Sequence, residues 1–217
     1  MAHASLTALL AFLFLAGNAN SAEPQALGRD QARQSLSDAN EQVRRQAASR
    51  LGEVGTMADV AALRVALRDA DADTRERAEQ AMWRIWARSG DSEIDRLYRT
   101  GVAQMSGGDL QQSITTFSRI IGRKPEFAEG WNKRATLYYL TGEYRKSLAD
   151  CKEVMKRNPH HFGALAGYGQ IYIKLEDYQR SLEFFRQALE VNPNMESVRL
   201  NILMLERLIE QRHRNMV

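Results

Sequence analysis

The sequence contains one cysteine and only four prolines among its 217 residues. A single cysteine excludes an intramolecular disulfide, and therefore a small fold that depends on disulfide bonds. The scarcity of proline, with many alanine, leucine, arginine, glutamate and glutamine residues, favours helix and argues against a strand-rich sandwich or a disordered chain. We therefore predict an all-α protein, which at this length forms one or two compact units.

The chain also lacks a strong excess of charge of one sign. The sequence has thirty basic and twenty-seven acidic residues, which gives a net charge of +3, and both signs are interleaved along the chain. A basic stripe of the kind that binds nucleic acid is therefore not indicated. We predict no nucleic-acid partner, and we interpret the charged residues as the solvated surface of helices.

Residues that carry chemistry are few. After residue 22, only His160, His161 and His213 remain beside Cys151, and the sequence has no glycine-rich phosphate loop and no metal-ligand spacing. We interpret His160 and His161 as surface residues at the start of a helix, and Cys151 as a structural thiol. The sequence thus predicts a non-enzymatic protein with no catalytic residue, no metal and no cofactor.

Residues 1–22 hold the main apolar run, from Leu6 to Ala16. No charged residue precedes Glu23, and the small residues Ala19 and Ala22 offer cleavage points. This pattern is typical of a secretory signal peptide, and its core is too short for an ordinary membrane-spanning helix. We predict a periplasmic protein without membrane insertion after signal cleavage. Because the run is not preceded by Lys or Arg, an uncleaved anchor is the alternative.

A first internal repeat has a period of thirty-one residues. Its first copy, Leu36, Asp38, Val43, Arg44, Ala47 and Leu51, recurs as Leu67, Asp69, Thr74, Arg75, Ala78 and Met82. Each copy predicts a helix, a turn whose aspartate accepts from free backbone N–H groups, a second helix, and an arginine that pairs back across the turn. Residues 29–90 resemble short HEAT repeats, so we assign residues 23–90 to a pair of HEAT-like repeats.

Two repeats are fewer than a free-standing solenoid needs. We therefore expect this block to pack on the rest of the chain through an apolar face of its last helix, which holds Met82, Trp83, Ile85 and Trp86. The alternative is that Trp83 and Trp86 form an exposed aromatic binding patch.

From Ser92 the period changes to thirty-four residues, with Pro125, Pro159 and Pro193 closing three units. A large, a small and an aromatic residue recur along the first helix of the second and third units, as Trp131, Ala135 and Tyr138 and as Leu165, Gly169 and Tyr172. Residues 91–193 thereby resemble three tetratricopeptide repeats, at 94–127, 128–161 and 162–193. The resemblance implies a right-handed α-α superhelix, or solenoid.

Residues 194–217 follow the last repeat. Apolar residues at helical spacing from Glu196 to Gln211 predict a capping helix, and we expect the tail from Arg212 to Val217 to be disordered. The alternative for this helix is a coiled-coil seam that forms a homodimer.

The resemblance implies that the first helices of the repeats line a concave groove, which binds a peptide or a partner helix. The predicted groove residues are Tyr98, Arg99, Val102, Met105, Asn132, Lys133, Thr136, Tyr139, Ala166, Gly167, Gln170, Ile173 and Lys174. Some tetratricopeptide proteins clamp the C-terminal carboxylate of chaperones, but the corresponding positions hold Tyr98, Val102, Lys133, Gly163 and Gly167. Only Lys133 suits that role, so we exclude a chaperone tail as the ligand.

Together these features predict a non-enzymatic scaffold for protein–protein interaction in the bacterial cell envelope. The alternative is a non-catalytic assembly or regulatory subunit of an envelope enzyme complex. The sequence does not identify the partner, because such repeats serve many unrelated functions.

Overall fold

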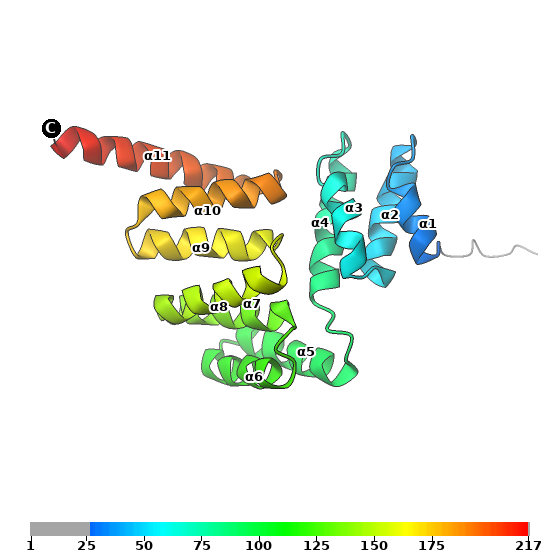
Figure 1. Ribbon diagram of the computed structural model, residues 1–217, viewed down its shortest axis with the longest axis horizontal. Helices are drawn as coiled ribbons and strands as arrows, with labels where there is room; N and C mark the ends of the chain where they lie inside the picture. Colours follow the sequence, from blue (N-terminus) through cyan, green and yellow to red (C-terminus); the bar gives the residue numbers. More distant parts are fainter. Residues whose placement is uncertain (1–26, 217) are drawn as a thin grey trace, which may run out of the picture.

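The computed structural model describes residues 27–216, and all regular structure within them is helical (Figure 1). The helices are α1 (Arg29–Ser35), α2 (Glu41–Val54), α3 (Val60–Ala66), α4 (Ala72–Trp86), α5 (Ser92–Ser106), α6 (Leu110–Arg123), α7 (Ala128–Leu140), α8 (Tyr144–Arg157), α9 (Phe162–Lys174), α10 (Tyr178–Val191) and α11 (Glu196–Met216), with a short 3-10 helix, η1 (Met57–Asp59), before α3. The all-α prediction is confirmed. The predicted signal peptide, residues 1–22, lies outside the described residues. Within residues 27–216, no helix has both the length and the hydropathy of a membrane-spanning segment.

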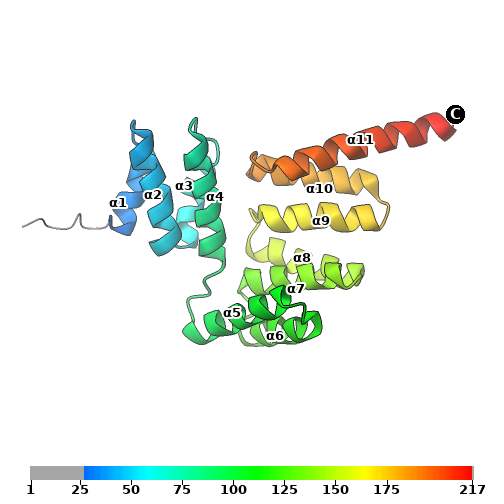
Figure 2. The same ribbon diagram turned by 180° about the vertical axis from the view of Figure 1, so that it is seen from behind.

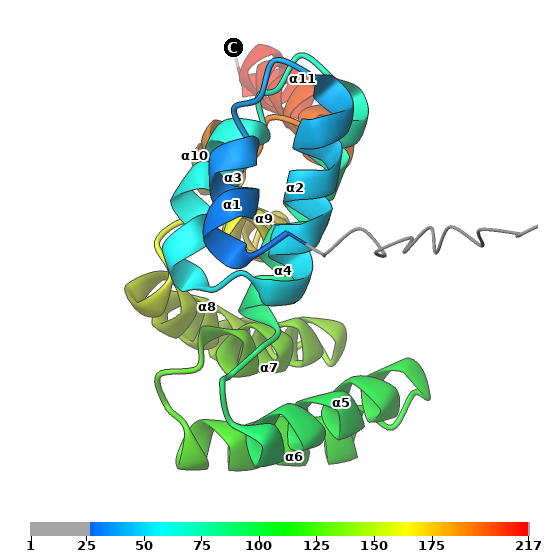
Figure 3. The same ribbon diagram turned by 90° about the vertical axis from the view of Figure 1, so that its right-hand side faces the viewer.

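The helices form two parts that stand side by side (Figures 1 and 2). The N-terminal block consists of α1–α4, in which α2 packs against α1 and α4. The second part is a stack of antiparallel hairpins, α5 with α6, α7 with α8 and α9 with α10, and α11 packs on α10. The axis of α4 runs across the ends of the stacked helices, and Figure 3 shows the block in front of the upper part of the stack.

Local contacts explain the turns of the N-terminal block. Asn40 caps α2 by accepting from the Gln42 N–H at 2.8 Å, and Asp71 caps α4 by accepting from Thr74 at 2.8 Å. Arg44 donates to the carbonyl oxygens of Asp38 and Ala39, which confirms the predicted pairing of an arginine back across its turn. Arg44 also binds both carboxylate oxygens of Asp69, at 2.7 and 2.8 Å, and so joins the two repeats, a contact that the period did not indicate.

The hairpins of the stack are held together by a repeated serine contact. The Oγ atoms of Ser113, Ser147 and Ser181 donate to the carbonyl oxygens of Gly101, Ala135 and Gly169 at 2.8, 2.7 and 2.8 Å. A Cβ atom on Gly101 or Gly169 would clash with the ring of Phe117 or Phe185. The small residues therefore let the paired helices approach closely, as the sequence pattern predicted.

The C-terminal helix is longer than the sequence suggested. Helix α11 continues to Met216, so the prediction of a disordered tail from Arg212 is wrong for the residues up to 216. The guanidinium of Arg212 explains part of this order, because it donates to Glu176 and to the Tyr178 hydroxyl, both at 3.2 Å. The inner face of α11 buries Val198 and Leu205, whereas its outer face is partly apolar and exposed.

One hydrophobic core spans both parts of the molecule. Met82, Ile85 and Trp86 of α4 belong to the same cluster as Phe162 and Leu165 of α9. Trp86 is only 4% exposed, so the expected packing of the block on the stack is confirmed. The alternative of an exposed aromatic patch is wrong, because Trp83 lies edge-on against Phe162, with ring centroids 5.1 Å apart.

Candidate functional site

A pocket of about 170 Å³ lies between α7 and α9, on the side of the stack lined by the first helices of the repeats. Among the predicted groove residues, it brings together Asn132, Thr136, Tyr139, Gly167 and Gln170. Its other lining residues are Ala135, Ser147, Cys151, Gly163 and Ile171.

The polar groups of this pocket are mostly neutral. Asn132 is 7% exposed, and its Nδ2 atom donates to Glu129 at 3.0 Å, which orients the amide. The hydroxyl of Thr136 donates to the Asn132 carbonyl oxygen at 3.0 Å. Gln170 supplies a second amide and Tyr139 a phenol. Amides and hydroxyls of this kind recognise a peptide backbone through hydrogen bonds without requiring a charge on the ligand.

Two glycines of α9, Gly163 and Gly167, differ in the space that is available to a side chain. A Cβ atom on Gly167 would meet only the Cys151 Sγ atom, at 3.8 Å, so this position opens into the pocket. A Cβ atom on Gly163 would clash with the indole of Trp83, which therefore fills the neighbouring position. The pocket is open at Gly167 and closed by the N-terminal block at Gly163.

Next to the pocket lies a buried carboxylate that the sequence prediction missed. Glu129 is 2% exposed and interacts with four side chains from two repeats. Its oxygens bind the Tyr98 hydroxyl at 3.3 Å, Asn132 at 3.0 Å, the Lys133 Nζ atom at 3.1 Å and the His161 Nε2 atom at 2.9 Å. These contacts satisfy a charge that would otherwise be costly to bury.

The prediction that His161 is a surface residue is wrong, although His160 is exposed as predicted. His161 is fully buried and caps α9, since its Nδ1 atom accepts from the Ala164 N–H at 3.1 Å. A backbone N–H can only donate, so Nδ1 is unprotonated and Nε2 carries the proton that it donates to Glu129. The imidazole also stacks on Trp86, with centroids 4.3 Å apart, which links the N-terminal block to this polar network.

The network shifts the titration of its members. Burial by itself raises the pKa of the Glu129 carboxyl, but the hydrogen bond from His161 and the charge of Lys133 bring that pKa below its ordinary value. Burial, reinforced by the nearby Glu129 carboxylate, raises the pKa of the Tyr98 hydroxyl. Burial likewise raises the pKa of the Cys151 thiol, to about 12, which agrees with its interpretation as structural.

The remaining predicted groove residues do not converge on the pocket. Val102 and Met105 pack against the core of the first repeat, and Ile173 packs against the core shared with the N-terminal block. Arg99 and Lys174 are exposed. Lys133 is not a free groove cation, because it pairs with buried Glu129 and lies 6.0 Å from the centroid of the Trp83 ring.

A signal for Glu129 and His161 was present but not specific. The two residues are 32 positions apart, close to the repeat length, so they occupy the starts of neighbouring first helices. An acidic residue in the first turn and a histidine before a helix are each common at solvated helix ends. The packing of Trp83 and Trp86 against the His161 ring distinguishes this pair from a surface pair.

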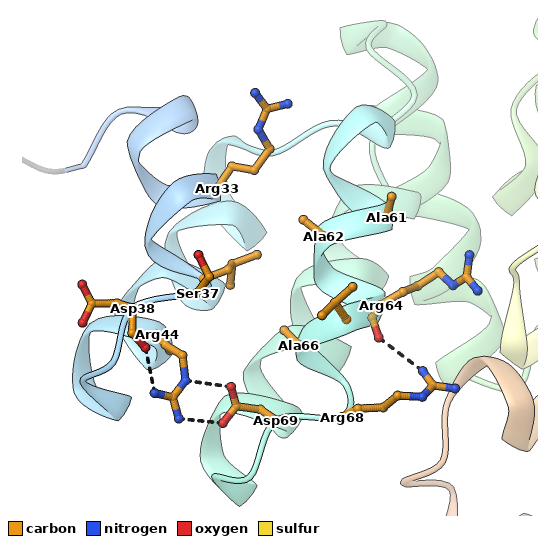
Figure 4. A pocket seen from close by; sticks show the side chains of 12 residues that line it. Arg33, Ser37, Asp38, Arg44, Ala61, Ala62, Arg64, Ala66, Arg68 and Asp69 are labelled. Carbon is orange, nitrogen blue, oxygen red and sulfur yellow. Dashed lines mark hydrogen bonds and ion pairs between the residues drawn. The ribbon is translucent and has the colours of Figure 1, made fainter.

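A larger hollow, of about 750 Å³, lies between α1 and α3 (Figure 4). Small side chains such as Ala61 and Ala62 line it, and the bidentate pair of Arg44 and Asp69 closes one end. Arg68 extends away from it to the carbonyl oxygens of Glu190 and Val191 in α10. Because these charged groups are already engaged, we take the pocket between α7 and α9 as the candidate site.

Among residues 27–216, no group of three or more His, Cys, Asp or Glu side chains is placed to hold a metal ion.

Comparison with known families identifies the hairpins. Residues 98–154 and 162–195 each match a family model described as "Tetratricopeptide repeat". The chain carries tetratricopeptide repeats. Both matches begin after the N-terminal block, so the HEAT-like interpretation of residues 29–90 stays a prediction.

Curated relatives share these repeats. A TPR repeat-containing protein of Rhizobium etli is 32% identical over 108 residues, which cover 50% of this chain and 53% of that protein. The small glutamine-rich tetratricopeptide repeat-containing protein of Dictyostelium discoideum is 27% identical over 52% of this chain and 34% of its own length. This chain therefore spans about half or less of the length of these relatives.

Solved structures agree with the fold. The Sgt2 TPR domain from Aspergillus fumigatus superposes with a TM-score of 0.54 at 21% identity, covering 57% of this chain and 83% of that domain. The first TPR domain of Spaghetti, bound to an HSP90 peptide, gives a TM-score of 0.53 at 16% identity and covers 55% of this chain and 96% of that domain. At these identities the likeness establishes the tetratricopeptide fold and nothing about the ligand.

Proposed function

We propose that this protein is a non-enzymatic interaction scaffold, which holds an extended segment of a partner protein in the groove between α7 and α9. The observation that supports the proposal most directly is the pocket above Gly167, where two amides, a hydroxyl and a phenol surround a position without a side chain. A glycine at that place lets a ligand backbone approach the helix closely, and the amides can pair with its N–H and C=O groups.

The charge of the groove supports an uncharged segment as the ligand. The structures of Spaghetti with an HSP90 peptide and of yeast Sti1 with an Hsp70 peptide are relatives in fold. In this chain, Lys133 is already paired with Glu129, and the indole of Trp83 covers Gly163. Neither position offers a free cation to a terminal carboxylate. We therefore propose that the ligand is an internal, mainly uncharged stretch of a protein and not a charged tail.

We further propose that the scaffold acts in the bacterial cell envelope. This proposal rests on the apolar run of residues 6–16 and the small residues near position 22, and a bacterial relative carries the same repeats. A non-catalytic subunit of an envelope enzyme complex would use the same groove, and enzyme activity that co-purifies with the chain would distinguish that role.

The experiment is affinity capture from envelope fractions with the wild-type chain and two glycine variants. Gly167→Leu fills the pocket, whereas Gly122→Leu makes the same change at a helical glycine with nothing within 4 Å. Proteins retained by the wild type and by Gly122→Leu, but lost with Gly167→Leu, would support the proposal. Equal retention by all three forms would refute binding at this pocket, provided that circular dichroism shows the same helix content in each.

The captured protein is then divided into overlapping synthetic peptides. We expect an uncharged internal peptide to bind the wild-type chain at least tenfold more tightly than Gly167→Leu, because the variant side chain occupies the space of the ligand backbone. If the tightest peptide is instead an acidic C-terminus, the proposed ligand class is wrong.

A further inference from the structure

A second small pocket lies at the junction between the N-terminal block and the turns of the repeats, apart from the proposed groove. Its volume is about 180 Å³, and its lining comes from the end of α4, from the turn before α7 and from the end of α8. The pocket therefore exists only because the block packs on the stack.

Two residues of this lining each carry a buried nitrogen atom that has no hydrogen-bond partner among the described residues. These atoms are the Nε1 atom of Trp86 and the Nδ2 atom of Asn158, whose residues are 4% and 3% exposed. Both side chains are held in place by other contacts: the Trp86 ring stacks on His161, and the Asn158 Oδ1 atom accepts from the His160 N–H at 3.3 Å. Buried hydrogen-bond donors are nearly always paired in folded proteins. Two unpaired donors on residues that line one pocket therefore indicate an acceptor that binds there.

The rim of the pocket carries an excess of positive charge. Arg88, Lys124, Arg157 and the carboxylate of Glu126 line it. Because Arg157 is paired with Glu153 at 2.6 Å, the excess charge comes from Arg88 and Lys124. Arg88 donates to the carbonyl oxygens of Gly52 and Gly55, at 2.6 Å each, and neither of these contacts supplies a negative charge. Lys124 is only loosely paired, since its Nζ atom is 3.8 Å from Glu126, whose side chain is 69% exposed. A bound anion would therefore be stabilised by the positive charge of the rim as well as by hydrogen bonds.

The walls of the pocket are apolar. Met57, Ile85 and Phe127 line it beside the polar groups, and Met57 is 52% exposed at its mouth. A purely hydrophilic anion such as phosphate would leave these walls without contacts. An anionic head with a short hydrocarbon chain would cover them and remove their area from water.

We propose that this pocket binds an aliphatic carboxylate. Its two oxygens would accept from the N–H groups of Trp86 and Asn158, the cations of the rim would balance its charge, and its hydrocarbon chain would lie against Met57, Ile85 and Phe127. The carboxylate can come from a free short-chain acid or from the C-terminus of a peptide that ends in an aliphatic residue. The proposal does not depend on the groove at Gly167.

The test is isothermal titration calorimetry of the full chain with valerate, with pentanamide, with inorganic phosphate, and with an acetylated pentapeptide that ends in leucine, as the free acid and as the amide. We expect the two carboxylates to bind and the two amides not to bind. Tighter binding by the peptide acid would identify a chain terminus as the source, and tighter binding by valerate would identify a free acid.

Matched variants locate the site. Asn158→Asp keeps the oxygen that accepts from His160 but replaces the donor with a repelling carboxylate, and Trp86→Phe removes the N–H group while keeping an aromatic ring on His161. Asn192 has the same orphan nitrogen in the next repeat but does not line the pocket, so Asn192→Asp is the control. We expect at least about a tenfold loss of affinity in the first two variants and no change in the control.

A substitution at the rim of the pocket tests the proposal without changing a buried residue. Lys124→Gln should weaken carboxylate binding severalfold, whereas Lys156→Gln, a change of an exposed lysine outside the pocket, should not. Binding of phosphate alone, equal binding of valerate and pentanamide, or equal losses in Asn158→Asp and Asn192→Asp would overturn the proposal. Because Lys124 does not line the pocket at Gly167, a failure of carboxylate binding would not contradict peptide capture by the groove.

Discussion

The indole ring of Trp83 in α4 packs so closely on Gly163 in α9 that a Cβ atom on Gly163 would clash with it; the Cζ2 atom of the ring is only 3.1 Å from the Cβ position. The same ring lies edge-on against His161, with centroids 5.4 Å apart. One end of the first-helix surface of the repeats is therefore covered by the chain itself. The N-terminal block is a structural part of the repeat domain and reduces the surface that a ligand can reach.

Substitution of the two neighbouring glycines of α9 should have opposite effects on stability. Gly163→Ala forces the Trp83 ring to move, so we expect a loss of about 1–3 kcal/mol in the free energy of unfolding. Gly167→Ala meets only Cys151, at 3.8 Å, and should gain up to about 1 kcal/mol because alanine favours helix over glycine. Urea denaturation followed by circular dichroism measures both changes. Equal effects of the two substitutions would contradict the packing of Trp83 on Gly163.

Removal of the charge of Glu129 should destabilise the junction of the repeats. In Glu129→Gln, the ion pair with Lys133 is lost and the hydrogen bond from His161 is weakened. We expect a loss of about 1–3 kcal/mol at pH 7 by urea denaturation. Glu143→Gln is the control, because that carboxylate pairs with Lys146 at the surface and its loss should change stability little.

The effect of Glu129→Gln should depend on pH. Because the folded protein holds the pKa of Glu129 below its ordinary value of 4.5, the ionised carboxylate stabilises the fold above about pH 4.5. This contribution is lost as pH falls below 4.5 and the carboxylate becomes protonated in the folded state. The pKa values of Asp59 and Asp69 are also lowered, so both forms should lose stability in acid. The difference between wild type and Glu129→Gln should shrink from pH 6 to pH 3; a constant difference would show that the charge is not responsible.

Glu176 occupies a backbone conformation that suits glycine. Its φ angle is 58°, and the equivalent turn positions of the other two hairpins hold Gly108 and Gly142, with φ angles of 85° and 79°. We expect Glu176→Gly to raise the free energy of unfolding by about 0.5–1 kcal/mol, because relief of the left-handed strain exceeds the entropy cost of glycine and the loss of the exposed contact with Arg212. Gly142→Ala should lower it by about 1 kcal/mol. Thermal unfolding measures both, and a lower melting temperature for Glu176→Gly would contradict the argument.

The thiol of Cys151 should be unreactive in the folded protein. Burial raises its pKa to about 12, so very little thiolate exists at pH 8, and the side chain is only 2% exposed. We expect the reaction with a thiol-specific disulfide reagent to be orders of magnitude slower in buffer than in 6 M guanidinium chloride. Rapid labelling of the native protein would show that the pocket above Cys151 opens easily.

The structure also changes an experiment that the sequence would have suggested. Reversal of Lys133 to Glu, intended to repel a ligand in the groove, would place a second carboxylate beside buried Glu129. The expected result is unfolding of the repeat junction, which would imitate a loss of binding. Lys174 is exposed, and its reversal tests the charge of the groove without that complication.

Some of the candidate site could be predicted from the repeats. Asn132, Thr136, Tyr139, Gly167 and Gln170 follow from the rule that first helices line the inner surface, and the structure places these five in one pocket. That rule does not predict the orientation of Tyr98. A side chain on the groove face can point to solvent or to a neighbouring side chain, and the next repeat decides which. Here its neighbour is Glu129, which draws the hydroxyl into the polar network.

The repeating part of the fold follows from the amino-acid sequence alone. The spacing of Pro125, Pro159 and Pro193, the small residues at Gly101, Ala135 and Gly169 and the apolar periodicity are local patterns, and each hairpin depends mainly on contacts within itself and with the next one. The environment of His161, Glu129 and Trp83 depends instead on the tertiary packing. Those side chains come from segments up to 78 residues apart, and their burial and hydrogen bonding depend on how the N-terminal block packs across the stack, which no local pattern encodes.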